Sequence, residues 1–121
     1  MGLDMTAYTT NETLTTDVDF DVEQHDILHY WCKHSNLHGW MEELYFAKGG
    51  RSRFFNCTNL GLSMADVLRL ETAISNDALP STSGFFFGKS YGDEKDGDLN
   101  FIFKARTAIE DGKRVFYRPW W

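Results

Sequence analysis

The chain has 121 residues, a formal net charge of −6 and an aromatic content of 16%. Its length and its 42% hydrophobic content are typical of a globular chain and exclude an intrinsically disordered one, so we expect residues 1–121 to form a single domain. The acidic balance disfavours broad nucleic-acid binding, which needs a basic face, and we expect no direct nucleic-acid partner.

The N-terminal half is expected to contain two strands followed by two helices. Alternating apolar and polar residues predict a strand over residues 3–10. Residues 14–23 also alternate and carry an acidic row, which predicts an amphipathic strand or extended arm. The row is either a solvated strand face, a divalent-metal edge or a DNA-like row of charges. Apolar spacing then predicts helices over residues 24–34 and 37–48.

The C-terminal half is expected to alternate between strands and helices. Residues 51–58 are predicted as a strand, and a capping-box spacing after Ser63 predicts a helix that ends near Asn76. A further helix is expected to be capped by Asp98, and a last strand covers residues 114–118 before a docked aromatic end. The whole pattern predicts an α+β domain, with a small, mostly antiparallel sheet and about four helices packed on it.

No targeting or membrane segment is expected. The N-terminus lacks the charged and apolar regions of a signal peptide, and no window is apolar enough to span a bilayer, so we expect no membrane association. Cys32 and Cys57 are too few for a disulfide framework, and we interpret them as reduced and semi-buried. These features predict a cytoplasmic protein.

Residues 30–41 combine tryptophans, histidines, a lysine and a thiol more densely than any other stretch. Ser35 and Asn36 favour caps and turns, so we expect a break there, with the aromatic side chains turned inward. This stretch is the first candidate for a site. The alternative is that it simply fills the core.

The histidines and cysteines of this region allow two kinds of chemistry. His25 and His29, and likewise His34 and His38, have a spacing of four that could chelate zinc from one helix face. No cysteine or carboxylate has a recognised zinc spacing, which favours exposed or hydrogen-bonded histidines, and we predict neither a metal nor a cofactor. Cys32 could act as a nucleophile, but a half-buried thiol is the commoner state.

Residues 84–90 superficially resemble a phosphate-binding loop. Three phenylalanines between the glycines are wrong in number and bulk for such a loop, so we reject a nucleotide hydrolase. The hydroxyl and lysine donors around this aromatic segment would still suit a phosphate and a base. The alternative is a core hairpin with a polar loop.

Three motifs carry a family resemblance over nearly the whole chain: the start Met-Gly-Leu-Asp-Met, residues 30–41 (Tyr-Trp-x-Lys-His-x-x-Leu-His-Gly-Trp-Met) and residues 79–88 (Leu-Pro-x-Thr-x-Gly-Phe-Phe-Phe-Gly). They resemble an uncharacterised family of small proteins encoded by tailed bacteriophages and prophages. The family usually has Arg at the position of Cys32. The resemblance implies a phage accessory protein in the bacterial cytoplasm and implies no particular reaction.

The leading hypothesis is a non-enzymatic binder of a small phosphorylated or nucleotide-like ligand, such as a host defence signal that the protein would sequester. Aromatic rings would stack on a base, while basic and hydroxyl groups would contact phosphates. No catalytic residue is assigned. The predicted ligand-binding residues are Trp31, Lys33, His34, His38, Trp40, Arg53, Ser83, Phe86, Lys89 and Ser90.

Two other functions remain open. The acidic segments at residues 17–23 and 93–98 could occupy a basic groove on a host defence or nucleic-acid-handling protein, which would make the chain a protein-binding inhibitor. A hydrolase that depends on His38 is the third hypothesis, and an enzyme is the less favoured class. The sequence also leaves a homo-oligomer open.

Overall fold

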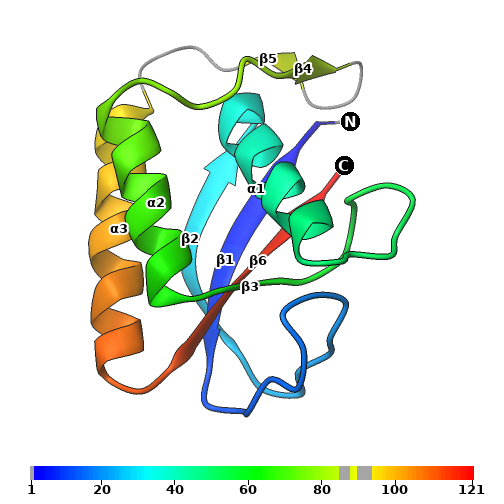
Figure 1. The fold of residues 1–121 in the computed structure, drawn as a ribbon, viewed down its shortest axis with the longest axis vertical. Helices are drawn as coiled ribbons and strands as arrows, with labels where there is room; N and C mark the ends of the chain where they lie inside the picture. The colour runs from blue at the N-terminus through cyan, green and yellow to red at the C-terminus, as the bar shows by residue number, and fades with distance from the viewer. Residues whose placement is uncertain (1, 85–87, 90–93) are drawn as a thin grey trace.

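The computed structural model describes residues 2–84, 88–89 and 94–121 (Figure 1). The main sheet has four antiparallel strands in the order β2-β1-β6-β3. These strands are β1 (Asp4–Thr10), β2 (Asp26–Cys32), β3 (Leu60–Leu62) and β6 (Arg114–Trp120). The helices are α1 (Ser35–Ala47), α2 (Met64–Ser75) and α3 (Lys95–Glu110). The α+β class is therefore confirmed, with three helices in the described part of the chain rather than about four.

Two further short strands lie apart from the main sheet. β4 (Ser83–Gly84) and β5 (Gly88–Lys89) pair with each other in an antiparallel ladder. In Figure 1 they lie beyond the end of α1, at the end of the molecule where α3 begins. The three phenylalanines at residues 85–87, which were expected to form a buried strand or aromatic turn, lie outside the described residues.

The prediction of a helix over residues 24–34 is wrong, because most of this segment forms β2. Its pairing with β1 contains a register shift between Ala7 and Tyr8. The shift leaves Ile27 70% exposed although Trp31, four residues later, is 6% exposed. The spacing that suggested one helical face therefore belongs to side chains on opposite faces of a strand.

Residues 14–23 form a loop with a single bridge, between Val18 and Leu60, instead of the expected strand or arm. The alternation still predicts which side chains turn inward. Phe20 is buried, whereas Asp19 and Asp21 are exposed. The alternating sequence therefore predicts which side chains of this loop are buried, although the loop lacks the hydrogen-bonded ladder of a strand.

The strand expected at residues 51–58 is also absent from the structure, which forms β3 a few residues later. Cys57 has a left-handed backbone (φ 58°), which interrupts an extended strand. Asn56 instead exchanges hydrogen bonds with the backbone of Trp121, donating at 2.7 Å and accepting at 2.9 Å. The C-terminus is thus docked, as expected.

Helix α2 begins as the sequence predicts. Ser63 and Asp66 form the complete capping box, and the helix ends at Ser75, within one residue of the expected Asn76. Helix α3 has Glu94 at its N-cap position, four residues before the predicted cap, so Asp98 is part of its first turn. That shift turns Asp98 inward, where it is 2% exposed.

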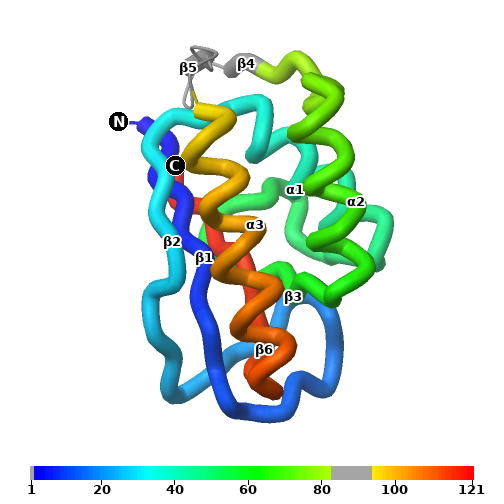
Figure 2. Tube along the Cα trace, turned by 90° about the vertical axis from the view of Figure 1, so that its left-hand side faces the viewer, coloured from blue at the N-terminus to red at the C-terminus, as the bar shows by residue number. Residues whose placement is uncertain are grey.

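The helices cover one face of the sheet, and the core lies between the two layers (Figures 1 and 2). Met5, Ala7 and Tyr117 belong to that core, with Ala7 opposite Tyr117 and Met5 two residues away on the same face of β1. On the other face Phe116 is covered by Phe20, which belongs to the loop between β1 and β2. The remainder of this second face, which we call the open face, carries exposed side chains.

Candidate functional site

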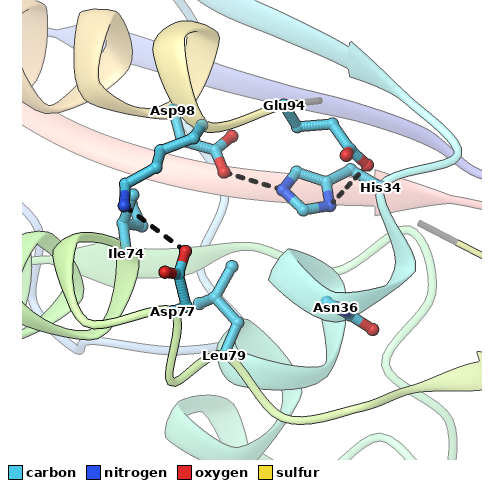
Figure 3. Close-up of a pocket in the computed structure, with 8 residues that line it drawn as sticks. His34, Asn36, Ile74, Asp77, Leu79, Glu94 and Asp98 are labelled. Atoms are coloured by element: carbon cyan, nitrogen blue, oxygen red, sulfur yellow. Dashed lines mark hydrogen bonds and ion pairs between the residues drawn. The ribbon is translucent and has the colours of Figure 1, made fainter. Parts of the chain in front are cut away.

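Trp31 and His34, two of the predicted ligand-binding residues, meet at the buried carboxylate of Asp98, and Figure 3 shows His34 beside it. The indole Nε1 of Trp31 donates to Asp98 Oδ1 at 3.0 Å, and His34 Nε2 lies 2.8 Å from Asp98 Oδ2. Glu94 Oε2 lies 3.3 Å from the other ring nitrogen of His34. Helix α3 therefore anchors residues 31–34 to the core through buried polar contacts.

A small cavity of about 140 Å³ lies beside this network. The residues that line it are His34, Asn36, Ile74, Asp77, Leu79, Glu94, Lys95 and Asp98. Its volume is below the range of roughly 300–1,000 Å³ typical of ligand pockets. Three of its side chains are carboxylates, and its Lys95 pairs with Asp77 at 3.4 Å. Neither its size nor its charge suits a phosphorylated nucleotide.

His38 lies in the core rather than at a surface. Its Nδ1 is 3.0 Å from the hydroxyl of Tyr117, and its ring stacks on Phe55 with centroids 5.4 Å apart. Burial lowers the pKa of His38 to about 4 and raises the pKa of Tyr117 well above its usual value. At neutral pH His38 is therefore uncharged and does not offer a cation to a phosphate.

Lys33, Trp40 and Arg53 lie at separate places near the surface. Lys33 is exposed and has a left-handed backbone (φ 59°), while Trp40 is half-buried against the core. The guanidinium of Arg53 lies 5.3 Å from the ring centroid of Phe54. The structure does not gather these side chains around one cavity.

The remaining predicted residues fall in or beside the part of the chain that is not described. Ser83 and Lys89 are backbone partners in the β4–β5 ladder. Phe86 and Ser90 lie outside the described residues. Their predicted contacts with a ligand stay a prediction.

Two of the family-like motifs contact each other. Ser35 Oγ donates to the carbonyl of Thr82 at 2.7 Å, and the Thr82 N–H donates to Asn36 Oδ1 at 2.8 Å. A Cβ placed on Gly39 would lie 2.0 Å from Thr82 Oγ1. The glycine of the first motif is therefore needed so that α1 can pack closely against the second motif.

A larger cleft, of about 410 Å³, lies between the loop at residues 19–21 and the segment at residues 51–59. Its lining residues are Asp19, Phe20, Asp21, Arg51, Ser52, Cys57, Thr58, Asn59 and Arg118. We call this space the arginine cleft, because Arg51 and Arg118 are its two cations. Its volume falls within the range typical of small-molecule sites.

The two guanidinium groups of the arginine cleft make no hydrogen bond or ion pair with any residue that the structure describes. Some other cations are paired, such as Lys48 with Asp66 and Arg106 with Glu71. Lys33, Lys113 and Arg114 also lack an ion pair to a described residue, but none of them lines a described cleft that holds two arginines. In an acidic chain an unpaired arginine at a cleft is a candidate contact for an anion.

Asn59 and Thr58 supply polar groups at the base of the cleft. Asn59 is 8% exposed, and its Nδ2 donates to the carbonyl of Phe20 at 2.7 Å. Its Oδ1, like the hydroxyl of Thr58, is buried with no hydrogen-bond partner among the described residues. A buried polar atom without a hydrogen-bond partner lowers the stability of the fold, unless a ligand or a water molecule supplies the missing hydrogen bond.

The carboxylates of the cleft have different roles. Both oxygens of Asp19 are engaged, one by the hydroxyl of Tyr45 and the other by the backbone N–H of Arg51 at 2.8 Å. The Asp19 carboxylate thus positions the backbone beside Arg51. Asp21 is exposed on the rim.

The open face continues from the cleft along β6. Arg118 lies opposite Thr6 and Trp120 lies opposite Asp4, so both side chains leave the sheet on the same face. Trp120 is 63% exposed, and Tyr30, opposite Thr6 on β2, is 53% exposed. Aromatic and arginine side chains are the types most enriched at binding hot spots.

Sequence reasoning missed Arg51, Arg118, Asn59 and Trp120 as site residues. Arg51 and Arg118 are far apart in the chain, and no local motif marks either of them. One available signal was the alternation along residues 114–120, which places Arg118 and Trp120 on the face opposite Tyr117.

Neither of the metal hypotheses gains support from the geometry. Within residues 2–84, 88–89 and 94–121, no group of three or more His, Cys, Asp or Glu side chains could hold a metal ion. Cys32 and Cys57, expected to be semi-buried, are both exposed, because each lies at a surface position where the backbone turns or a strand faces outward.

In the described part of the chain, none of the helices is long and apolar enough to cross a bilayer. In comparisons with known proteins, no family model, no curated protein and no solved structure matches the chain.

Proposed function

We propose that the protein is a non-enzymatic binder of a small phosphorylated ligand, which it holds in the arginine cleft. The observation that carries this proposal is the pair Arg51 and Arg118, whose guanidinium groups flank one cleft without an ion pair to any described residue. A guanidinium presents parallel N–H donors that match two phosphate oxygens.

The polar base of the cleft fits the rest of such a ligand. The hydroxyls of Ser52 and Thr58 can donate to phosphate oxygens. The free Oδ1 of Asn59 can only accept, so it suits a sugar hydroxyl or an amine rather than the phosphate itself. A sugar phosphate or nucleotide contains both kinds of group.

Trp120 favours a nucleotide-like ligand over a simple sugar phosphate. Its ring lies two residues from Arg118 on the same face of β6, roughly 7 Å along the strand. A base that stacks on an exposed indole gains about 1–3 kcal/mol. On the resemblance to phage proteins, the ligand would be a host defence signal, which the protein would sequester.

The proposal assigns no reaction. Cys57 lines the cleft, but no histidine is among the described lining residues to act as its base. His34 and His38 make contacts inside the protein. The hypothesis of a hydrolase that depends on His38 therefore has no geometric support in the described residues.

The test is a binding series with inorganic phosphate, nucleoside mono- and diphosphates and cyclic nucleotides. Tryptophan fluorescence and the thermal melting temperature are the two measurements of binding. A ligand that binds should raise the melting temperature, because it binds only the folded state. Arg51→Ala and Arg118→Ala should each weaken binding roughly 10- to 100-fold, the effect of losing one charged hydrogen-bonding group.

Arg106→Ala is the control, since Arg106 is a partly exposed arginine outside the cleft that pairs with Glu71 on α2. It should leave the affinity unchanged. If no member of the series binds, or if all three arginine variants behave alike, the proposal fails.

A second candidate function is supported by the acidic loop between β1 and β2. Residues 11–28 contain no Lys or Arg. Their acidic residues are Glu12, Asp17, Asp19, Asp21, Glu23 and Asp26. Exposed Ile27, Tyr30 and Trp120 lie on the open face beside this loop. Apolar anchors next to a single-sign rim suit a basic protein partner.

A photo-reactive amino acid placed at Tyr30 or Trp120 tests this second function in bacterial cells. The same partner protein should cross-link from both positions and should not cross-link from Phe103 on α3. The cross-linked product should disappear at high salt, because the ions screen the attraction between the charges. Equal labelling from Phe103, which is also exposed, would contradict a specific face.

A further inference from the structure

Strand β2 forms one edge of the sheet and is its outermost strand in Figure 2. Among the described residues it pairs only with β1. Its seven residues, Asp-Ile-Leu-His-Tyr-Trp-Cys, contain no proline or lysine, and Ile27 and Tyr30 are exposed. Natural proteins usually block an edge of this length, because it offers unpaired peptide groups to another strand.

The register shows which peptide groups point outward. The N–H of Lys33 donates to the carbonyl of Leu3 at 2.8 Å, so the peptide groups of alternate residues, Lys33 and Trp31, face β1. The peptide groups of Tyr30 and Cys32 therefore face away from the sheet. Nearby, Lys104 Nζ lies 3.5 Å from the carbonyl of Leu28, so a strand that pairs along the whole of β2 must displace this ammonium group.

The opposite edge of the sheet is protected. β3 has three residues, and Val18 forms a bridge with Leu60 beside it. The N–H of Gly61 donates to the carbonyl of Asp17 at 2.7 Å. The fold thus closes one edge with its own loop and leaves the other open.

We propose that a second copy of this chain covers the open edge, with the two β2 strands antiparallel about a two-fold axis at Tyr30. A two-fold axis always sets identical edges against each other, so the outward groups of Tyr30 meet the same groups of the second copy. The result is one continuous eight-stranded sheet, since each copy contributes four strands.

The charges of β2 favour this antiparallel partner. Asp26 lies at one end of the strand and Lys33 follows the other end. Antiparallel pairing brings Asp26 of one copy near the second copy's Lys33, and a parallel arrangement would not. The net charge of −6 on each copy opposes association, so added salt should strengthen the dimer.

The dimer is independent of the proposed ligand function. Arg118 and Trp120 lie on β6, and β1 separates β6 from β2. Pairing at β2 therefore leaves the arginine cleft free in each copy. It also places the two open faces side by side on one surface.

Sedimentation equilibrium of the full chain tests the proposal. The unmodified protein should be a dimer, and Tyr30→Lys should weaken association roughly tenfold or more, because two like charges then face each other across the axis. Trp120→Ala should leave the dimer intact. A protein that is monomeric at every concentration and salt level would overturn the proposal.

A cross-linking variant confirms the register without disturbing the edge. In a background of Cys32→Ser and Cys57→Ser, Tyr30→Cys should form an intermolecular disulfide on oxidation, because hydrogen-bonded antiparallel pairs have Cα atoms about 5.5 Å apart. Phe103→Cys, equally accessible on α3, should not. Equal cross-linking of both variants would indicate random collision and would contradict the proposed axis.

These outcomes separate the two proposals. If the chain is monomeric but still binds the phosphorylated ligand, the proposed dimer fails and the proposed ligand site stands. If the chain is a dimer but no phosphorylated ligand binds, the proposed ligand site fails and the proposed dimer stands.

Discussion

The two faces of the sheet differ sharply although the same strands build both. On β2, Trp31 faces the helices and is 6% exposed, whereas its neighbour Tyr30 faces outward and is 53% exposed. On β6, Tyr117 is fully buried while Arg118 is exposed. Because successive side chains alternate, one residue step separates a core position from a candidate contact.

This comparison changes how the dense aromatic and histidine motif should be interpreted. Trp31 Nε1 and His34 Nε2 contact Asp98, and His38 Nδ1 contacts Tyr117. Their role in the described structure is to fix α1, β2 and α3 relative to one another. The candidate contacts for partners are instead spaced singly along the opposite face.

The largest expected difference in the free energy of unfolding is between variants of Trp31, on the buried face, and of Trp120, on the open face. Trp31→Ala removes a buried ring that packs against Phe101 and should lower the free energy of unfolding by about 3–5 kcal/mol. Trp120→Ala removes an exposed ring and should change it by about 0.5 kcal/mol or less. Urea denaturation measures both, and similar losses would show that the open face is packed as tightly as the core.

Asp98 offers the next test, with Asp96 as its control in the same first turn of α3. Asp98→Ala leaves the Trp31 indole N–H and His34 without their buried acceptor and should cost about 3 kcal/mol. Asp96 is exposed, so Asp96→Ala should cost only about 0.5 kcal/mol through the helix dipole. Equal losses in urea denaturation would show that the dipole, rather than the buried network, explains the effect.

The sequence predicted those parts of the fold whose signals are local. The capping box of Ser63 and Asp66 identified the start of α2, and alternation identified β1. The helix predicted over residues 24–34 was wrong because the register shift opposite Ala7 and Tyr8 places Ile27 on the other face of the strand from Trp31. This register shift depends on the partner strand. No local pattern contains that information.

The candidate site could be predicted less well than the fold. Arg51 and Arg118 meet only because Cys57 turns the chain back to β6, where its N–H donates to the carbonyl of Pro119 at 2.8 Å. Such a contact between distant residues follows from tertiary structure. The aromatic residues of the 30–41 motif were expected to turn inward, and this holds only in part: Trp31 is buried and Trp40 half-buried, but Tyr30 is 53% exposed.

His38 should make stability depend on pH. Its folded pKa of about 4 lies below the unfolded value of 6.5, so the unfolded state binds more protons between these values. The stabilisation is complete above pH 6.5 and falls as the pH decreases towards 4, by up to about 3 kcal/mol. His29, whose pKa burial also lowers, acts in the same direction.

Comparison with His38→Gln isolates the contribution of this side chain. Chemical denaturation at several pH values should show a shallower decline for the variant over this interval. Parallel curves for both proteins would mean that the imidazole is accessible to protons in the folded state.

The smallest expected effect is a change in the pKa of Tyr30, on the open face. Its hydroxyl donates to Asp4 Oδ1 at 2.6 Å, and this hydrogen bond is the main reason that the pKa of Tyr30 is raised to about 12. Asp4→Asn should return the pKa towards 10, since the amide oxygen accepts the bond without the negative charge. An ultraviolet difference titration against Tyr30→Phe isolates this phenol from the other tyrosines. If Tyr30 joins two copies at an axis, its titration should also shift with protein concentration, and Trp120→Ala should not remove that dependence.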